Sequence, residues 1–485
     1  MDDTIESSEP IRAALAEFLS QLTQLILRAD PASFPLANLE RSEPFIHLPF
    51  YLNELAGTTL SYIYGDNPGL NEAMNWRDAL ADRIRRYILD GLPIDQSITA
   101  GIVKLSQELV RPASTWRQIL IVSGISFVGE PFQLLRGTFV YPASSLDDAD
   151  TMLAGQHIVG GEILKGRSND NWVALVSEGI VPKLALSTSP VTEVGLGYHE
   201  RESLITAIRL TKSHFSTIAG EILIDLADFP SRPPSVYSGR LGTSGISLQM
   251  PPLVEPTSFT SEEFNESVNI YRRLTARGSA VRSFEVLPDP FSQAVDRFNQ
   301  SFESRGVWED VTNLTIALEA LLGVGQEISY RLSARCASLL ACPFSEVEEV
   351  HALVRAMYEI RSAVAHGAPK RFSKPLAMLS GIPKKTPSMI IKGQADDSRS
   401  QLTIPAEYER WRRGLIRAQN LVRLALLACL TLASNSHQSH RWPFGDSLDS
   451  ELLSPAKRDA WRAAAGIIES DMGRHSLLKT ASMPD

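Results

Sequence analysis

Apolar residues recur at helical spacing through most of the second half of the chain, and this pattern predicts a series of packed helices. The series begins after Pro288 and Pro290, which separate it from the preceding part of the chain. Each predicted helix has one apolar face, so we expect the helices to pack together as a bundle. They cover residues 290–304, 307–323, 327–341, 346–366 and about 406–433.

The pattern in the first half of the chain is different. Helical spacing over 9–28, 74–90 and 97–110 gives way, from about Trp116, to short apolar or alternating runs separated by Gly, Pro, Asn and Asp. These runs predict strands, and a stretch rich in Pro, Ser and Gly over 230–260 predicts a loop before a helix near 261–277. The predicted strands lie at 118–122, 137–141, 172–176 and 221–226.

Together these patterns predict a multidomain chain in which a mixed α+β region precedes an all-α bundle. The α+β region covers 1–280, helical over 1–112 and β-rich over 113–280; the bundle covers 285–435. A polar tail over 436–485 contains one predicted short helix near 455–469. The length of 485 residues and the 44% of hydrophobic residues are sufficient for two or three separate cores.

Charge and cysteine content narrow the class of protein. The net charge is −9, and residues 1–284 carry 23 basic against 33 acidic residues, whereas 285–435 carry 18 against 16. The acidic first part favours a protein or small-molecule trigger there over a second nucleic-acid surface. Three cysteines without CxxC spacing indicate a reducing compartment. The acidic amino terminus and the short apolar run over 424–433 predict a soluble, cytoplasmic protein without a membrane span.

The predicted helix over 346–366 carries the residues that point to chemistry. Ser345 and Glu348 form a capping box, and Gly367 provides a stop signal. Arg361 falls on the apolar stripe of this helix, where a buried guanidinium needs a carboxylate, a phosphate or a partly open cleft. His366 lies in the last turn of the same helix. An arginine and a histidine near one helix end are therefore the leading candidate site.

Three segments in order resemble the HEPN superfamily, and most closely its ApeA-like branch, over residues 285–435. They are Leu-Thr-Ile-Ala-Leu-Glu-Ala-Leu-Leu over 314–322, Ser-Tyr-Arg-Leu-Ser-Ala-Arg-Cys-Ala-Ser-Leu-Leu over 329–340, and Met-Tyr-Glu-Ile-Arg-Ser-Ala-Val-Ala-His-Gly over 357–367. The resemblance implies a helical bundle that dimerises and cleaves RNA without a metal ion or cofactor. It implies that Arg361 and His366 are the catalytic pair and that Ser362 is the small polar residue after the arginine. It also implies a toxin or antiphage, abortive-infection role.

Physical chemistry supports the same assignment of roles. Cleavage of RNA through its own 2′-hydroxyl needs a proton shuttle and a cation for the developing phosphorane charge, which suit histidine and arginine. Residues five apart on a helix differ in direction by about 140°, so Arg361 and His366 converge only at a helix end or across a dimer. Tyr358, Ser362 and His366 share one face.

Further basic residues are candidates for binding the RNA backbone. Arg331 and Arg335 lie on one helical face. A segment over 370–395 that contains no acidic residue provides the others, which are Lys370, Arg371, Lys374, Lys384 and Lys385. No cluster of Asp, Glu, His or Cys has metal-ligand spacing.

A structural interpretation accounts for the same residues without catalysis. Arg361 pairs with Glu319 inside the bundle, His366 stabilises the negative end of its helix, and Arg331 and Arg335 pair with Glu327 or Glu319. The basic segment is then a solvated loop. The chain would in that case be a non-catalytic module that dimerises or binds RNA or a nucleotide, with Glu319 as a structural partner.

Overall fold

The computed structural model describes a large part of the chain, and the predicted helix over 9–28 and the proposed boundary near 280 lie outside that part. The described residues are 49–50, 52, 70–109, 111, 113–142, 145–146, 172–182, 196, 198–212, 216–226, 235–237, 257–278, 289–302, 307–323, 328–340, 347–367, 372–382, 389–392, 401–404, 406–435 and 446–464.

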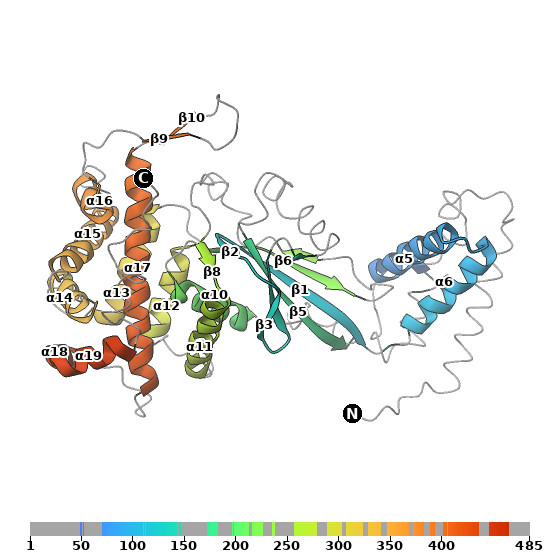
Figure 1. The fold of residues 1–485 in the computed structure, drawn as a ribbon, viewed down its shortest axis with the longest axis horizontal. Coiled ribbons are helices and arrows are strands. Elements are labelled where there is room, and N and C mark those ends of the chain that lie inside the picture. The colour runs from blue at the N-terminus through green and yellow to red at the C-terminus, as the bar shows by residue number, and fades with distance from the viewer. Residues whose placement is uncertain are drawn as a thin grey trace.

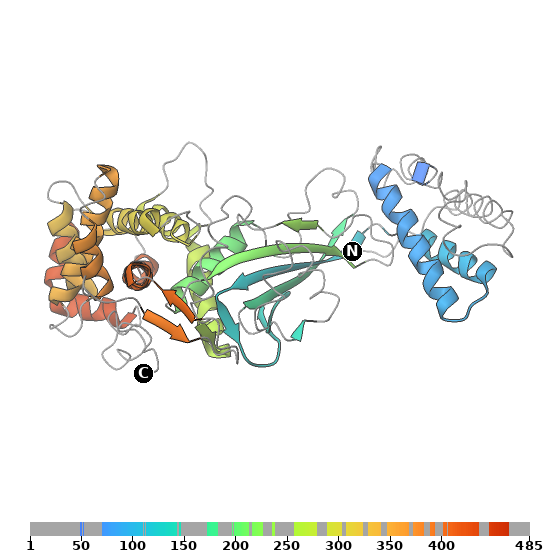
Figure 2. The same ribbon diagram turned by 90° about the horizontal axis from the view of Figure 1, so that it is seen from above.

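A mixed α+β region precedes a helical bundle, as the hydrophobic pattern predicts. Figures 1 and 2 show a pair of helices at one end, a sheet in the middle and the bundle at the other end. The helical pair comprises α5 (Leu70–Leu89) and α6 (Ile94–Leu109), which pack on each other through Leu80, Ile84 and Gly101. None of the described helices combines the length and the apolar composition needed to cross a membrane.

The sheet has six strands in the order β3-β4-β5-β1-β6-β7, and its described pairings are antiparallel. Its central strand β1 buries Ile119 and Ile121 on one face and Leu120 and Val122 on the other. Both faces of the sheet are therefore covered. The strands are β1 (Ala113–Ser123), β3 (Phe132–Leu135), β4 (Thr138–Pro142), β5 (Trp172–Pro182), β6 (Thr217–Asp225) and β7 (Ser235–Tyr237).

Two helices connect the sheet to the bundle. Helix α10 (Tyr198–Thr211) packs Leu204 and Ile208 against the Leu120 face of the sheet, and its Ala207 and Leu210 belong to the core of the bundle. Helix α11 (Ser261–Gly278) packs beside it and is preceded by β8 (Thr257–Phe259), which pairs in parallel with β2 (Ile125–Phe127). The layer formed by α10 and α11 thus packs against both the sheet and the bundle.

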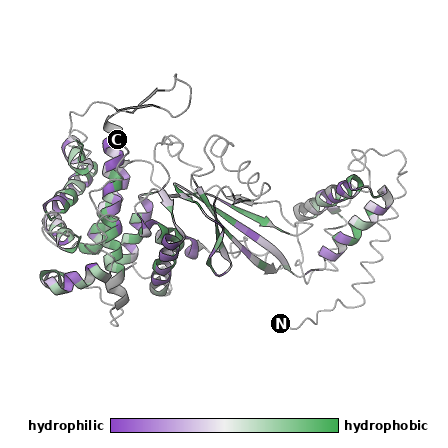
Figure 3. Cartoon of the chain, viewed as in Figure 1, coloured by the Kyte–Doolittle hydropathy of each residue, from purple (hydrophilic) through white to green (hydrophobic). Residues whose placement is uncertain are grey.

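The bundle forms around one long helix, α17, which Figure 2 shows end-on among its neighbours. Its residues from Ala418 to Leu430 are buried throughout, and Figure 3 shows apolar residues concentrated along this stretch. The bundle helices are α12 (Pro290–Gln300), α13 (Val307–Leu322), α14 (Ile328–Leu340), α15 (Val347–Ala365), α16 (Ser373–Ser380), α17 (Ala406–Asn435), α18 (Asp446–Leu453) and α19 (Pro455–Ala464).

Several elements differ from the sequence-based expectation. The described part of the tail contains two helices, α18 and α19, where one is predicted, and both pack against α14. The basic segment over 370–395 contains α16 and the strand β9 (Met389–Lys392), which pairs with β10 (Gln401–Ile404). The 230–260 segment, predicted as a loop, includes two short strands, β7 and β8. Helix α10 has no counterpart among the predicted elements.

Arginines on one element satisfy the carbonyl groups at the end of another helix in four places. The last carbonyls of a helix have no partner within it, and a cation beside them also opposes the negative end of the helix dipole. The donors and their acceptors are Arg423 with Leu210 and Thr211 at the end of α10 (3.0 and 3.4 Å), Arg335 with Leu322 of α13 (2.7 Å), Arg417 with Leu379 of α16 (2.9 Å), and Arg462 with Ser338 and Leu339 of α14 (2.7 and 3.0 Å).

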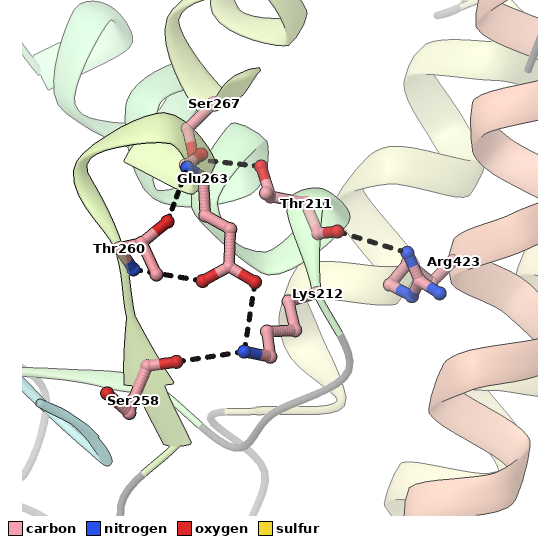
Figure 4. Close-up of polar contacts among 7 residues, drawn as sticks. All are labelled: Thr211, Lys212, Ser258, Thr260, Glu263, Ser267 and Arg423. Atoms are coloured by element: carbon pink, nitrogen blue, oxygen red, sulfur yellow. Dashed lines mark hydrogen bonds and ion pairs between the residues drawn. The ribbon is translucent and has the colours of Figure 1, made fainter. Parts of the chain in front are cut away.

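Figure 4 shows the contact from Arg423 to the carbonyl of Thr211, which joins the end of α10 to the bundle. Its Nε also donates to Oδ1 of Asn420 at 2.9 Å, and burial lowers the pKa of Arg423 to about 10, which leaves the guanidinium charged at neutral pH. On the other side of the junction, the hydroxyls of Thr211 and Ser267 are 2.8 Å apart, and Lys212 pairs with Glu263 at 3.0 Å. The end of α10 is therefore fixed from both sides.

We predict that Arg423→Met lowers the free energy of unfolding by about 2–4 kcal/mol, because it leaves two buried carbonyls and one amide oxygen without their donor. Urea denaturation of the full chain measures this change. The matched control is Arg272→Met on the exposed face of α11, which should change stability by no more than about 0.5 kcal/mol. Equal effects of the two substitutions would contradict the assigned role of Arg423.

Candidate functional site

Helix α15 positions the predicted pair of residues. Its buried face comprises Val350, Leu353, Val354, Ala356, Met357, Ile360 and Ala363. Arg361 lies at the margin of this face, with 35% of its side chain exposed. The helix ends as predicted at a glycine in the left-handed region, Gly367 with φ of 60°, and its N–H donates to the carbonyl of Val364 at 3.1 Å. His366 lies in this terminal turn and is exposed.

Arg361 forms an ion pair with Glu319 of α13, at 3.3 Å between Nη2 and Oε2. The Glu319 side chain is 18% exposed, and its other oxygen, Oε1, is buried without a hydrogen-bond partner among the described residues. Burial raises the pKa of Glu319, and the nearby charge of Arg361 opposes this rise. The pair anticipated by the structural interpretation is therefore present, and it leaves part of the guanidinium accessible to solvent.

Two predicted supporting residues lie next to this pair. The guanidinium carbon of Arg361 is 5.8 Å from the centre of the Tyr358 ring, within the range of a cation–π contact. Ser362 is partly buried, and its carbonyl accepts a hydrogen bond from the N–H of His366 at 3.1 Å. The structure thus places Glu319 and Tyr358 each beside the guanidinium of Arg361, and it places His366 at the helix end.

A groove of about 610 Å³ opens beside this site, between α14 and α15. The side chains of Tyr330, Ser333, His351, Arg355 and Tyr358 line it. Tyr358 therefore belongs to both the groove and the Arg361 contact. Sequence reasoning missed His351 and Arg355, although their spacing with Tyr358 and Ser362 on one helix predicts a shared face.

The predicted RNA-binding residues have different surroundings. Arg335 is buried, and it donates to both carboxylate oxygens of Asp449 at 2.6 and 2.8 Å in addition to the carbonyl of Leu322. This placement favours the structural interpretation of Arg335, with Asp449 of α18 as its partner. Arg331 is partly exposed and Lys374 is exposed on α16. The remaining candidates, Lys370, Arg371, Lys384 and Lys385, lie outside the described residues.

Within the described part of the chain, no group of three or more His, Cys, Asp and Glu residues is placed to hold a metal ion. Cys336 and Cys429 are buried and are not part of a disulfide, and burial raises the pKa of the Cys336 thiol. These two cysteines are therefore inert parts of the core.

Comparison of the chain with models of protein families, with curated proteins and with solved structures gives no match. The resemblance to the HEPN superfamily therefore stays a prediction that depends on the three quoted segments. The geometry defines a coarser class: a helical bundle with an anchored, partly exposed arginine and an exposed histidine at the end of one helix.

The Glu319–Arg361 pair predicts a specific pH dependence. An acid whose folded-state pKa is raised binds its proton more tightly when folded, so Glu319 stabilises the fold at low pH and this contribution is lost as pH rises from 4.5 through the raised value. Arg361→Met removes the attraction that opposes the rise, so we expect a larger loss over a wider pH window.

Chemical denaturation of four proteins between pH 4 and 7 tests this dependence: the parent, Arg361→Met, Glu319→Gln and the double variant. Glu319→Gln has no carboxyl to titrate, so Arg361→Met should have no effect on the pH profile in that background. If Arg361→Met widens the pH-dependent loss equally with and without Glu319, the two residues are not electrostatically coupled.

Proposed function

We propose that this protein is a metal-independent endoribonuclease of the HEPN type, with Arg361 and His366 as its catalytic residues. One observation carries this proposal: a guanidinium that Glu319 holds in place but leaves 35% exposed lies on the same helix as an exposed imidazole in the terminal turn. A purely structural arginine on the margin of a core gains nothing from a neighbouring exposed histidine. A phosphate ester that reacts through a proton shuttle needs both.

The proposed reaction uses the ribose itself as the nucleophile. The 2′-hydroxyl attacks the adjacent phosphorus, the bond to the 5′-oxygen of the next nucleotide breaks, and a 2′,3′-cyclic phosphate and a 5′-hydroxyl result. One proton leaves the 2′-oxygen and one joins the departing 5′-oxygen, and histidine as a residue type exchanges protons near neutral pH. Arg361 stabilises the charge on the phosphorane oxygens, and Glu319 fixes its orientation.

The proposed catalytic unit is a homodimer. Arg361 and His366 point about 140° apart around α15, so a single copy of the helix does not aim both side chains at one phosphate. A second copy that packs against the end of α15 would combine the arginine of one protomer with the histidine of the other. The proposed contact surface is the end of α15 that carries Ser362 and His366.

The part of the chain before the bundle is proposed to control or target cleavage. Its acidic balance favours a protein or small molecule as the trigger, and α10 connects its sheet directly to the bundle core. By resemblance to the HEPN superfamily, the proposed biological role is that of a toxin or antiphage effector that cleaves cellular RNA in an abortive-infection response.

A second candidate function is favoured by the ion pair itself. Because Glu319 already neutralises Arg361, the bundle is alternatively a non-catalytic module that dimerises or binds RNA or a nucleotide. In that case Glu319→Ala and Arg361→Ala should lower the free energy of unfolding equally, and the parent protein should not cleave RNA.

For the ribonuclease, we predict that Arg361→Ala and His366→Ala each lower the cleavage rate of a labelled RNA at least about a hundredfold, since each removes a group that acts on the reacting phosphate. Growth toxicity on expression should disappear in parallel. Cleavage rates and cell growth are measured beside His199→Ala and Arg272→Ala, which alter an exposed histidine and an exposed arginine far from α15.

The interpretation depends on an intact fold in each variant. Circular dichroism and sedimentation should show the same helical content and the same oligomer as the parent. A folded His366→Ala or Arg361→Ala protein that cleaves at the parental rate would remove the residue from the proposed catalytic pair.

A further inference from the structure

The groove between α14 and α15 presents an exposed aromatic surface. Tyr330 is 67% exposed, although a large aromatic side chain usually gains stability from burial. Its ring lies 6.1 Å from the imidazole of His351, edge to face, so the two rings form one wall. Tyr358 contributes a third ring to the lining. Three rings around one open groove are a surface on which flat ligands stack.

The groove also contains an exposed cationic side chain, Arg355, that can bind a ligand. Arg355 is 63% exposed, and its described ion pair is with Glu359 one turn further along α15, at 3.3 Å between Nε and Oε1. Both side chains are largely in solvent, where such a pair contributes little, so a phosphate can replace the carboxylate at small cost. Ser329 and Ser333, on the same helix as Tyr330, add polar groups to the lining.

The groove leads to the candidate catalytic residues. Tyr358 lines the groove and also lies against the guanidinium of Arg361. Arg355 and Arg361 are six residues apart on one helix, which corresponds to about 9 Å along its axis and about 120° around it, with Tyr358 midway between them. A chain of nucleotides that occupies the groove would therefore continue toward the proposed reacting phosphate.

We propose that this groove is a subsite for single-stranded RNA, in which one nucleobase stacks on the exposed ring of Tyr330, the imidazole of His351 supports that ring edge to face, and Arg355 binds the adjoining phosphate. The inference rests on the proposed ribonuclease function and adds the preference for an unpaired strand, because a base inside a duplex cannot reach a stacking surface. A second copy of the protein fits the groove less well. The groove is concave and its lining includes polar and charged side chains, whereas the central part of a stable protein interface is apolar and depleted in charge.

Binding is measured with a fluorescent single-stranded RNA of mixed sequence and the full-length His366→Ala protein, which holds the substrate without cleaving it. Tyr330→Ala and Arg355→Ala in this background should each weaken binding about tenfold. Tyr330→Phe keeps the ring and should bind like the parent, and Arg272→Ala controls for general loss of positive charge. A double-stranded RNA of the same sequence should bind more weakly than the single strand.

Cleavage kinetics of the same substitutions in the parent background separate the two proposals. We expect Tyr330→Ala to raise KM with kcat retained, because it acts on binding and not on the reacting phosphate. If the parent protein cleaves RNA and Tyr330→Ala leaves KM unchanged, the proposed subsite is wrong, whereas the proposed ribonuclease function is not affected. Groove-dependent binding by a protein that does not cleave RNA would support the subsite and favour the non-catalytic, RNA-binding module.

Two further results would also overturn the subsite. If the His366→Ala protein does not bind the RNA at all, the groove is not an RNA site. If sedimentation shows that Tyr330→Ala converts a dimer into a monomer, the groove is a contact between copies of the chain.

Discussion

Arginine hydrogen bonds to helix carbonyls hold this structure together, and the contact from Arg423 to the end of α10 is the one on which the connection between sheet and bundle depends. Helix α10 is buried from Leu204 to Thr211, so it has no solvent to satisfy its last carbonyls. A second buried arginine, Arg209, donates to Asn299 of α12 at 2.9 Å and lies 4.3 Å from the ring centre of Phe302. Polar contacts thus fix a helix that apolar packing alone would leave free to slide.

Hydrogen bonds from arginines of α17 also connect α10 to the helix that carries the candidate site. Arg423 and Arg417 lie on α17, and Arg417 donates to the carbonyl of Leu379 and to Glu349 in the first turn of α15. One long helix therefore touches both the layer beneath the sheet and the helix that carries Arg361 and His366. The contacts of Arg423 and Arg417 thus join α10 and α15 to the same helix.

The helices of the bundle could be located from the sequence because their apolar residues recur at helical spacing. The Glu319–Arg361 pair could be anticipated as one of two alternatives because Arg361 is a charged residue on an apolar stripe. Helix α10 could not be found in this way, since its residues from Leu204 to Thr211 are all buried and this stretch has no amphipathic stripe. Asp449 could not be anticipated as a partner of Arg335, because it lies 114 residues away in a tail that looks polar. The groove escaped notice since its wall combines Tyr330 of α14 with His351 of α15, and only their packing brings the rings together.

The ends of the RNA fragments test the proposed chemistry most directly. Purified full-length protein is incubated with mixed cellular RNA in excess chelator, beside the His366→Ala variant, and the fragment ends are identified. We predict fragments with 2′,3′-cyclic phosphate and 5′-hydroxyl ends that form despite the chelator and disappear in the variant. Fragments with 3′-hydroxyl ends, or cleavage that the chelator abolishes, would contradict a metal-independent reaction through the 2′-hydroxyl.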